Sequence, residues 1–183
     1  MTDARPLVTL DLDGVICRPP FGINVGISTD FLDASAPPAP ARVPPRLLSR
    51  VADRVRFDYR RPLPDAAAAL RELQTVRRII VLTGRRTSPE PWLRRHGLAD
   101  AIERIVTNDT RMRSPHFKLD VLARLAPREH VDDDGRTAQL LAERSPVRVY
   151  LRDWPRNRGA QYAPGVVRVA DLAAFARLVR AEA

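Results

Sequence analysis

Short apolar runs rich in β-branched residues alternate along this chain with longer stretches in which apolar residues recur every three or four positions. The short runs are typical of β-strands and the longer stretches of amphipathic α-helices. The predicted strands are Leu7–Leu12, Arg78–Thr83, Arg104–Thr107, Glu129–Asp132, Val147–Leu151 and Val166–Val169. The predicted helices are Pro62–Val76, Pro89–His96, Phe117–Leu125, Gly135–Arg144 and Ala170–Ala181. This alternation predicts an α/β fold with a central parallel sheet covered by helices.

Residues 16–61 interrupt the alternation. They contain a glycine-bearing loop, a tract rich in proline and alanine at 34–45, and one amphipathic stretch, Pro45–Arg56. Proline-rich backbone favours an extended, stiff conformation, so the tract is interpreted as a connector. Because a chain of 183 residues is typical of one domain, we expect a single domain over 1–183 with an insertion at 16–61.

The chain is basic, with 31 lysine and arginine residues against 22 acidic ones and a formal charge of +9. Such a charge can indicate nucleic-acid binding. The arginines are spread along the whole chain, however, and no basic run contains interleaved aromatic residues. We therefore interpret most of them as solvated surface residues. Lys118 is the only lysine, which makes its position informative.

Several classes of protein are disfavoured by the sequence. No apolar stretch approaches the 18 to 20 residues of a membrane-spanning helix, and the first residues do not resemble a secretory signal. The single cysteine, Cys17, has no partner for an internal disulfide. We expect a cytoplasmic protein that does not bind a membrane.

Polar residues follow the predicted strands at the points where ligands bind in parallel sheets. Asp11-Leu12-Asp13-Gly14 comes after the first strand, Thr83-Gly84-Arg85 after the second, and Asp132-Asp133-Asp134 after the fourth. Lys118 lies near the start of a predicted helix. We expect these groups to meet at one edge of the sheet, with Asp134 serving chiefly as a helix cap.

In their order and type, these residues resemble the four motifs of the haloacid dehalogenase (HAD) superfamily: DxDG, a strand-ending Thr or Ser, a Lys, and a paired acid. The resemblance covers about residues 7–144. It implies a three-layer, Rossmann-like fold in which residues 16–61 form a flap or minimal cap. It also implies a phosphatase, because the dehalogenases of the superfamily lack the second acid of the first motif, here Asp13.

Phosphoryl transfer needs a nucleophile, a proton donor for the leaving oxygen, and positive charge around the phosphate. Asp11 can attack phosphorus to form an aspartyl phosphate, and Asp13 can protonate the leaving group. Lys118 would reduce the repulsion between nucleophile and phosphate. Thr83 and the Gly84 amide would donate hydrogen bonds to a phosphate oxygen.

Carboxylates and a phosphate repel one another strongly unless a cation joins them. Mg²⁺ prefers oxygen ligands in octahedral geometry, and Asp11 and Asp132 would supply two of them. The resemblance implies that the backbone carbonyl of Asp13 is a further ligand and that Asp133 binds through water or from the surrounding shell. Mg²⁺ is therefore the expected cofactor.

Residues for substrate binding are sought in three places. Phe21 and Asn24 lie in the region of the flap, and Arg85 follows Thr83-Gly84. Arg152, Trp154 and Asn157 form a segment similar to the R-P-x-N loop of deoxynucleotidase-like members. The expected partner is a small phosphorylated metabolite or a nucleotide. His96, His116 and His130 show no metal-binding spacing and are assigned structural roles.

The arginine content is compatible with two other functions. The arginine-rich surface is compatible with a nucleic-acid-associated protein that keeps the fold without catalysis. It is also compatible with a phosphatase that acts on the ends of nucleic acids. Substrate specificity depends on loops whose positions the sequence does not determine. The sequence does not determine the oligomeric state either.

Overall fold

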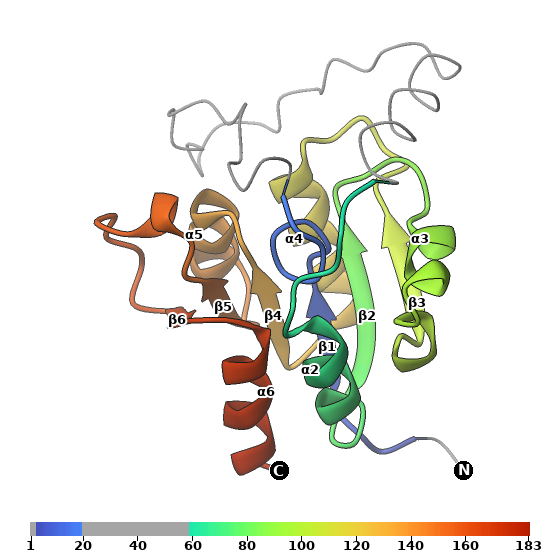
Figure 1. The fold of residues 1–183 in the computed structure, drawn as a ribbon. Coiled ribbons are helices and arrows are strands. Elements are labelled where there is room, and N and C mark those ends of the chain that lie inside the picture. Colours follow the sequence, from blue (N-terminus) through green and yellow to red (C-terminus); the bar gives the residue numbers. More distant parts are fainter. Residues whose placement is uncertain (1–2, 20–58) are drawn as a thin grey trace.

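Six parallel strands form one sheet in the order β3-β2-β1-β4-β5-β6. The computed structural model describes residues 3–19 and 59–183, and Figure 1 shows their arrangement. The strands are β1 (Leu7–Leu10), β2 (Arg78–Thr83), β3 (Arg104–Thr107), β4 (Glu129–Asp132), β5 (Arg148–Arg152) and β6 (Val166–Val169). Every neighbouring pair runs parallel, as the sequence predicted.

Helices cover both faces of the sheet. They are α2 (Ala66–Leu73), α3 (Glu90–Arg95), α4 (Ser114–Leu125), α5 (Gly135–Arg144) and α6 (Leu172–Ala181), with 3₁₀ turns η2 (Ala99–Ala101) and η3 (Pro155–Asn157). Helices α2 and α6 pack on one face, and α4 and α5 pack on the other (Figure 1). The three-layer α/β architecture is therefore confirmed.

The core consists of two apolar clusters, one on each face of the sheet. Strand β5 shows how one strand serves both, because successive side chains of a strand point to opposite faces. Tyr150 packs into the cluster under α6, with its ring 4.8 Å from that of Phe175. Val149 and Leu151 pack into the cluster under α4 and α5. Burial on both faces explains why these strands have few exposed positions.

The sheet changes direction beside β1. From β1 the chain builds outward through β2 to β3, and then returns to place β4 on the other side of β1. In such sheets the crevice beyond the carboxyl ends of the strands at this point is the usual ligand site. The ends of β1, β2 and β4, which carry Asp11, Thr83 and Asp132, are consequently neighbours.

Strand β4 is buried although three of its four residues are polar. Each of the three has a partner. Glu129 accepts hydrogen bonds from Arg77 Nε and Nη2, both at 3.0 Å, and both side chains are buried. His130 and Asp132 contact one another. A polar strand is tolerated in the middle of the sheet because its groups are paired.

Two helices, α2 and α4, begin three or more residues from their predicted starts. The predicted start at Pro62 is wrong, because Pro62 forms an isolated bridge with Cys17 and the Leu63 N–H donates to the Ile16 carbonyl at 2.8 Å. This extended pairing delays α2 until Ala66. Helix α4 begins earlier than predicted, at Ser114, with Pro115 in its first turn, a position that suits proline.

The two ends of the predicted insertion at 16–61 lie side by side, because the Arg18 N–H donates to the Arg61 carbonyl at 2.9 Å. The Pro-rich connector at 34–45, the predicted helix Pro45–Arg56, Phe21 and Asn24 lie outside the described residues. Among the helices that the structure does describe, none combines the length and apolar character needed to cross a bilayer.

Candidate active site

Asp11 and Asp132 lie on either side of the Lys118 ammonium group. Lys118 Nζ is 2.9 Å from Asp11 Oδ1 and 2.8 Å from Asp132 Oδ2. Asp11 directly follows β1, and its backbone N–H still donates to the Val131 carbonyl of β4 at 2.9 Å. Lys118 comes from the second turn of α4. Two neighbouring strands and one helix thus bring together three groups that are far apart in the sequence.

Burial and charge act in opposite directions on these groups. Burial raises the pKa of Asp11 well above its usual value, despite the opposing charge of Lys118. Burial alone would lower the pKa of Lys118, but Asp11 and Asp132 raise it above its usual value. Lys118 is therefore a permanent cation. Burial alone would raise the pKa of Asp132, yet Lys118 and His130 hold it well below the usual range.

The Asp132 carboxylate is oriented by four hydrogen-bonding groups. Its Oδ1 accepts from the backbone N–H groups of Asp133 at 2.9 Å and Asp134 at 3.0 Å. Its Oδ2, besides Lys118, lies 3.1 Å from His130 Nε2. Burial lowers the pKa of His130, so the neutral ring donates from Nε2 and can accept from the Thr9 hydroxyl at Nδ1, 2.9 Å away.

Asp134 occupies the N-cap position of α5, as predicted, but its side chain does not cap the helix backbone. Its Oδ2 accepts from the Thr137 hydroxyl at 2.8 Å. The N–H groups of the loop before the helix are directed at Asp132 instead. The loop is therefore organised around Asp132 rather than around a helix cap.

Three buried acids form a group that fits a metal ion. Asp11, Asp132 and Asp133 each offer a carboxylate oxygen, and these atoms lie within 4.8 Å of one another. Buried carboxylates this close repel strongly without a cation. An all-oxygen ligand set suits Mg²⁺ rather than a thiolate- or imidazole-preferring metal. The predicted contribution of the Asp13 carbonyl stays a prediction.

Asp133 is held by Arg156. Arg156 Nη2 donates to the Asp133 carbonyl at 2.7 Å and to its Oδ2 at 2.5 Å. Burial nevertheless raises the pKa of Asp133 to about 7. The same carboxylate packs against Gly14, where an added Cβ would lie 1.7 Å from Asp133 Oδ2. Gly14 also has a φ of +78°, a backbone conformation that other residues rarely adopt. Glycine is therefore required at this position, because a side chain would strain the backbone and collide with Asp133.

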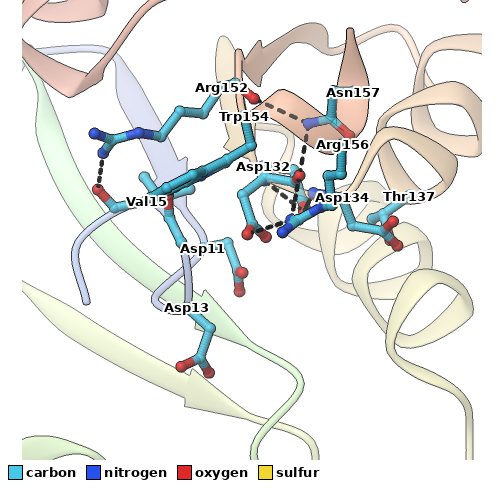
Figure 2. A network of polar contacts seen from close by, with 12 residues as sticks. Asp11, Asp13, Val15, Asp132, Asp134, Thr137, Arg152, Trp154, Arg156 and Asn157 are labelled. Atoms are coloured by element: carbon cyan, nitrogen blue, oxygen red, sulfur yellow. Dashed lines mark hydrogen bonds and ion pairs between the residues drawn. The ribbon is translucent and has the colours of Figure 1, made fainter. Parts of the chain in front are cut away.

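Asp13 is bound by two arginines and lies outside this acidic group. Arg85 donates from Nε to Asp13 Oδ2 at 2.8 Å and from Nη2 to Oδ1 at 2.6 Å, and Arg60 Nη1 also donates to Oδ1. Burial alone would raise the pKa of Asp13, but Arg85 and Arg60 lower it. In Figure 2 the Asp13 side chain points away from Arg156 and the Asp132 loop.

Solved structures of the same architecture are hydrolases. A D,D-heptose 1,7-bisphosphate phosphatase from B. bronchiseptica, complexed with magnesium and phosphate, has a TM-score of 0.57 at 16% identity, with 97% of this chain and 99% of that chain covered. A haloacid dehalogenase-like hydrolase from Xanthomonas campestris has a TM-score of 0.60 at 13% identity, with 97% and 96% covered. This chain has the HAD fold.

The HAD-fold matches also include a 2-haloacid dehalogenase from Pseudomonas syringae pv. tomato, with a TM-score of 0.59 at 15% identity and 98% and 100% of the two chains covered. Neither a protein-family profile nor a curated protein sequence matches the chain. The superfamily resemblance drawn from the sequence is confirmed at the level of the fold. The deoxynucleotidase-like branch stays a prediction.

Thr83 and Gly84 lie where the HAD resemblance places the phosphate-binding group, at the end of β2. Thr83 is buried, and its Oγ1 accepts from the Arg85 N–H at 3.2 Å. A Cβ on Gly84 would lie 2.4 Å from Ser114 Oγ. The small residue lets the end of β2 approach the first turn of α4, the helix that carries Lys118.

The segment after β5 contacts two acidic loops, the loop after β1 that carries Asp13 and the loop after β4 that carries Asp133 (Figure 2). Arg152 Nη1 donates to the Val15 carbonyl at 3.0 Å, and Trp154 Nε1 donates to the Gly14 carbonyl at 2.9 Å. Asn157 Nδ2 donates to the Asp133 carbonyl at 2.9 Å. These donors, which the sequence assigned to substrate, contact the backbone; their role in substrate binding stays a prediction.

Three residues of the site escaped the sequence analysis. His130 was assigned an ordinary structural role, although it shares a strand face with Asp132 at a spacing of two residues, which was a usable signal. Arg60 and Arg156 carry no such signal. Their contacts with Asp13 and Asp133 join residues 47 and 23 positions apart, and nothing in the sequence separates them from the other arginines.

Proposed function

We propose that this protein is a Mg²⁺-dependent phosphomonoester hydrolase that acts through an aspartyl phosphate on Asp11. The observation that carries the proposal is that Lys118 contacts both Asp11 and Asp132. A third buried acid, Asp133, lies beside them, and Asp13 follows Asp11 by two residues. The proposed substrate is a small phosphorylated metabolite or a nucleotide.

Each residue has a defined task in this reaction. Asp11 attacks phosphorus, and Asp13, after it takes up a proton from solvent, donates that proton to the leaving oxygen. Asp13 then accepts a proton from the water that cleaves the aspartyl phosphate. Lys118 and Thr83 stabilise the charge on the phosphate oxygens. Mg²⁺, held by Asp11, Asp132 and Asp133, would neutralise the charge of the phosphate and orient it.

The charge of the site supports a dianionic substrate. Four carboxylates, those of Asp11, Asp13, Asp132 and Asp133, are faced by four cationic side chains. These cations are Arg60, Arg85, Lys118 and Arg156. If all four acids are ionised around a bound Mg²⁺, the described groups balance one another, and the ion's charge of about +2 would offset the negative charge of about −2 on a phosphomonoester near neutral pH.

The comparisons are compatible with more than one hydrolase. The phosphatase from B. bronchiseptica is complexed with magnesium and phosphate, whereas other matches are dehalogenases. The presence of Asp13 supports a phosphatase, because the HAD resemblance implies that dehalogenases lack this acid. The buried three-acid group supports a metal-dependent reaction.

The direct test is phosphate release from a panel of sugar phosphates, nucleoside monophosphates and oligonucleotides phosphorylated at one end. We expect turnover of at least one small phosphomonoester with Mg²⁺, loss of turnover in excess EDTA, and recovery when Mg²⁺ is restored. Turnover of oligonucleotide ends without turnover of mononucleotides would favour a nucleic-acid-end phosphatase. No release from any phosphoester would contradict the proposal.

Replacing Lys118 with arginine should lower kcat by roughly 10²-fold or more, because a buried donor at the reacting groups is misplaced. The ammonium group contacts two carboxylates in a site with little spare volume, and the broader guanidinium does not fit the same geometry. The matched control is Arg124→Lys, an exposed residue of the same helix that pairs with Asp120. Near-normal kcat in Lys118→Arg would contradict the assigned role.

A further inference from the structure

The side chains of the two arginines that bind Asp13 are more deeply buried than the Asp13 carboxylate. Their side chains are only 4% (Arg85) and 8% (Arg60) exposed, whereas that of Asp13 is 29% exposed. The Arg85 N–H donates to Thr83 Oγ1, and the Arg85 carbonyl accepts from the Asn108 N–H at 2.8 Å. The Arg60 carbonyl accepts from Trp92 Nε1 at 2.8 Å. The backbone of both arginines is thus anchored, and both guanidinium groups are buried in the free protein.

The geometry of these cations suits an anion with more oxygens than a carboxylate. Arg85 already uses two donors, on both oxygens of Asp13, and Arg60 adds a third donor on one of them. Guanidinium groups bind phosphate through paired, charge-assisted hydrogen bonds. A phosphate offers three terminal oxygens and a second negative charge, so two guanidinium groups can donate to more oxygens of a phosphate than of a carboxylate.

The position of the pair favours the phosphate of the substrate as that anion. Arg85 follows Thr83 and Gly84 at the end of β2, beside the end of β1. Arg60 lies next to the backbone that pairs with Ile16 and Arg18, immediately after the Asp13 loop. Both arginines therefore flank the loop that carries the nucleophile.

We propose that Arg60 and Arg85 form a phosphate-binding subsite that the Asp13 carboxylate occupies in the free protein and that the substrate phosphate takes over. The exchange replaces one anion by another on the same donors and releases the Asp13 side chain toward the leaving oxygen. The inference deepens the proposed function and rests on it. It also explains how a carboxylate bound by two cations becomes available for proton transfer.

The alternative is that the arginines only hold Asp13 in position. The two cases differ in the coupling between Asp13 and Arg85. If phosphate and Asp13 compete for the same donors, removing the carboxylate charge improves phosphate binding less when Arg85 is absent, because only the Arg60 donor is then contested. If Asp13 merely repels phosphate through space, removing its charge improves binding equally with or without Arg85.

The test is calorimetric titration of inorganic phosphate, with Mg²⁺ present, into wild type, Asp13→Asn, Arg85→Gln and the double variant. We expect Asp13→Asn to lower the phosphate Kd about 10-fold, Arg85→Gln to raise it about 10-fold, and the double variant to gain clearly less than 10-fold over Arg85→Gln. An equal gain in both backgrounds, or no gain in Asp13→Asn, would overturn the proposal. Arg60→Gln replaces Arg85→Gln if the latter does not fold.

The matched control is the exposed pair Arg78–Glu103, in which Arg78 opens β2 at the opposite end of the strand from Thr83. Glu103→Gln and Arg78→Gln make the same charge changes and should leave the phosphate Kd unchanged. Phosphoester turnover by wild type with no coupling between Asp13 and Arg85 would reject this inference and keep the proposed function. Coupling between Asp13 and Arg85 in phosphate binding, without turnover of any phosphoester, would reject the proposed function and keep the shared phosphate subsite.

Discussion

Replacing Asp11 with asparagine should reduce kcat for any phosphomonoester that the wild-type protein hydrolyses by roughly 10⁴-fold or more, as expected when a nucleophile is removed. The carboxylate is the group proposed to form the covalent bond to phosphorus, and the amide of asparagine is not a competent nucleophile. The replacement has nearly the same size, so the contacts around β1 and α4 are kept.

The same variant should fold at least as stably as wild type when no metal is bound. Burial raises the pKa of Asp11, so the folded state binds its proton more tightly than the unfolded state does. At pH values above the raised pKa the ionised carboxylate costs stability, and stability increases as the pH falls through that pKa. The neutral amide removes this cost, while Lys118 keeps Asp132 as its partner.

The measurement compares kcat and metal-free thermal unfolding of wild type, Asp11→Asn and a control, Asp120→Asn. Asp120 lies on α4 and pairs with Arg124 in an exposed i,i+4 contact, so its replacement should change neither quantity appreciably. Equal kcat in wild type and Asp11→Asn would refute the nucleophile assignment.

Replacing Arg77 with alanine should lower the free energy of unfolding by about 3 kcal/mol, because it removes the main partner of the buried charge on Glu129. Both side chains of this pair are almost completely buried, at 1% and 0% exposure, and they make two hydrogen bonds of 3.0 Å. The variant leaves Glu129 with the longer contact to Arg128, whose Nε lies 3.3 Å from Glu129 Oε1 and whose side chain is 44% exposed.

The next residue in the chain provides the control. Arg78 pairs with Glu103 on the surface, with both side chains more than one-third exposed, and Arg78→Ala should cost less than about 1 kcal/mol. Urea unfolding measures both variants. A double replacement, Arg77→Met with Glu129→Leu, should recover much of the lost stability because it removes both charges. Equal losses for Arg77→Ala and Arg78→Ala would contradict this explanation.

The sequence predicted the sheet well because every predicted strand contains β-branched residues and most are separated by stretches with helical periodicity. Four of the six predicted strands agree with the structure at both ends. The start of α2 was missed for a physical reason. Pro64 already disfavours helical backbone at Leu63, and the pairing of Leu63 with Ile16 is a long-range contact that the helical periodicity does not record.

Some residues of the candidate site were predictable from the sequence, and others were not. Asp11, Lys118 and Asp132 were identifiable because the ends of parallel strands converge, and the structure brings them into contact. Arg85 was named from its place after Thr83 and Gly84, but its ion pair with Asp13 was not predicted, and Arg60 and Arg156 were not named. An ion pair depends on side-chain direction across elements far apart in the sequence. Substrate preference was beyond the sequence for a related reason: the residues proposed for it lie largely in loops.

The tie between the acidic loops and the segment after β5 also bears on how the protein is made. Every acid and the lysine of the proposed centre have been synthesised by residue 134, but Arg152, Trp154 and Asn157, which join the loops at Gly14, Val15 and Asp133, come later. A nascent chain that ends within α5 has the ligands without the groups that hold them. We therefore expect the proposed centre to be held together only after the segment that carries Arg152, Trp154 and Asn157 has been synthesised.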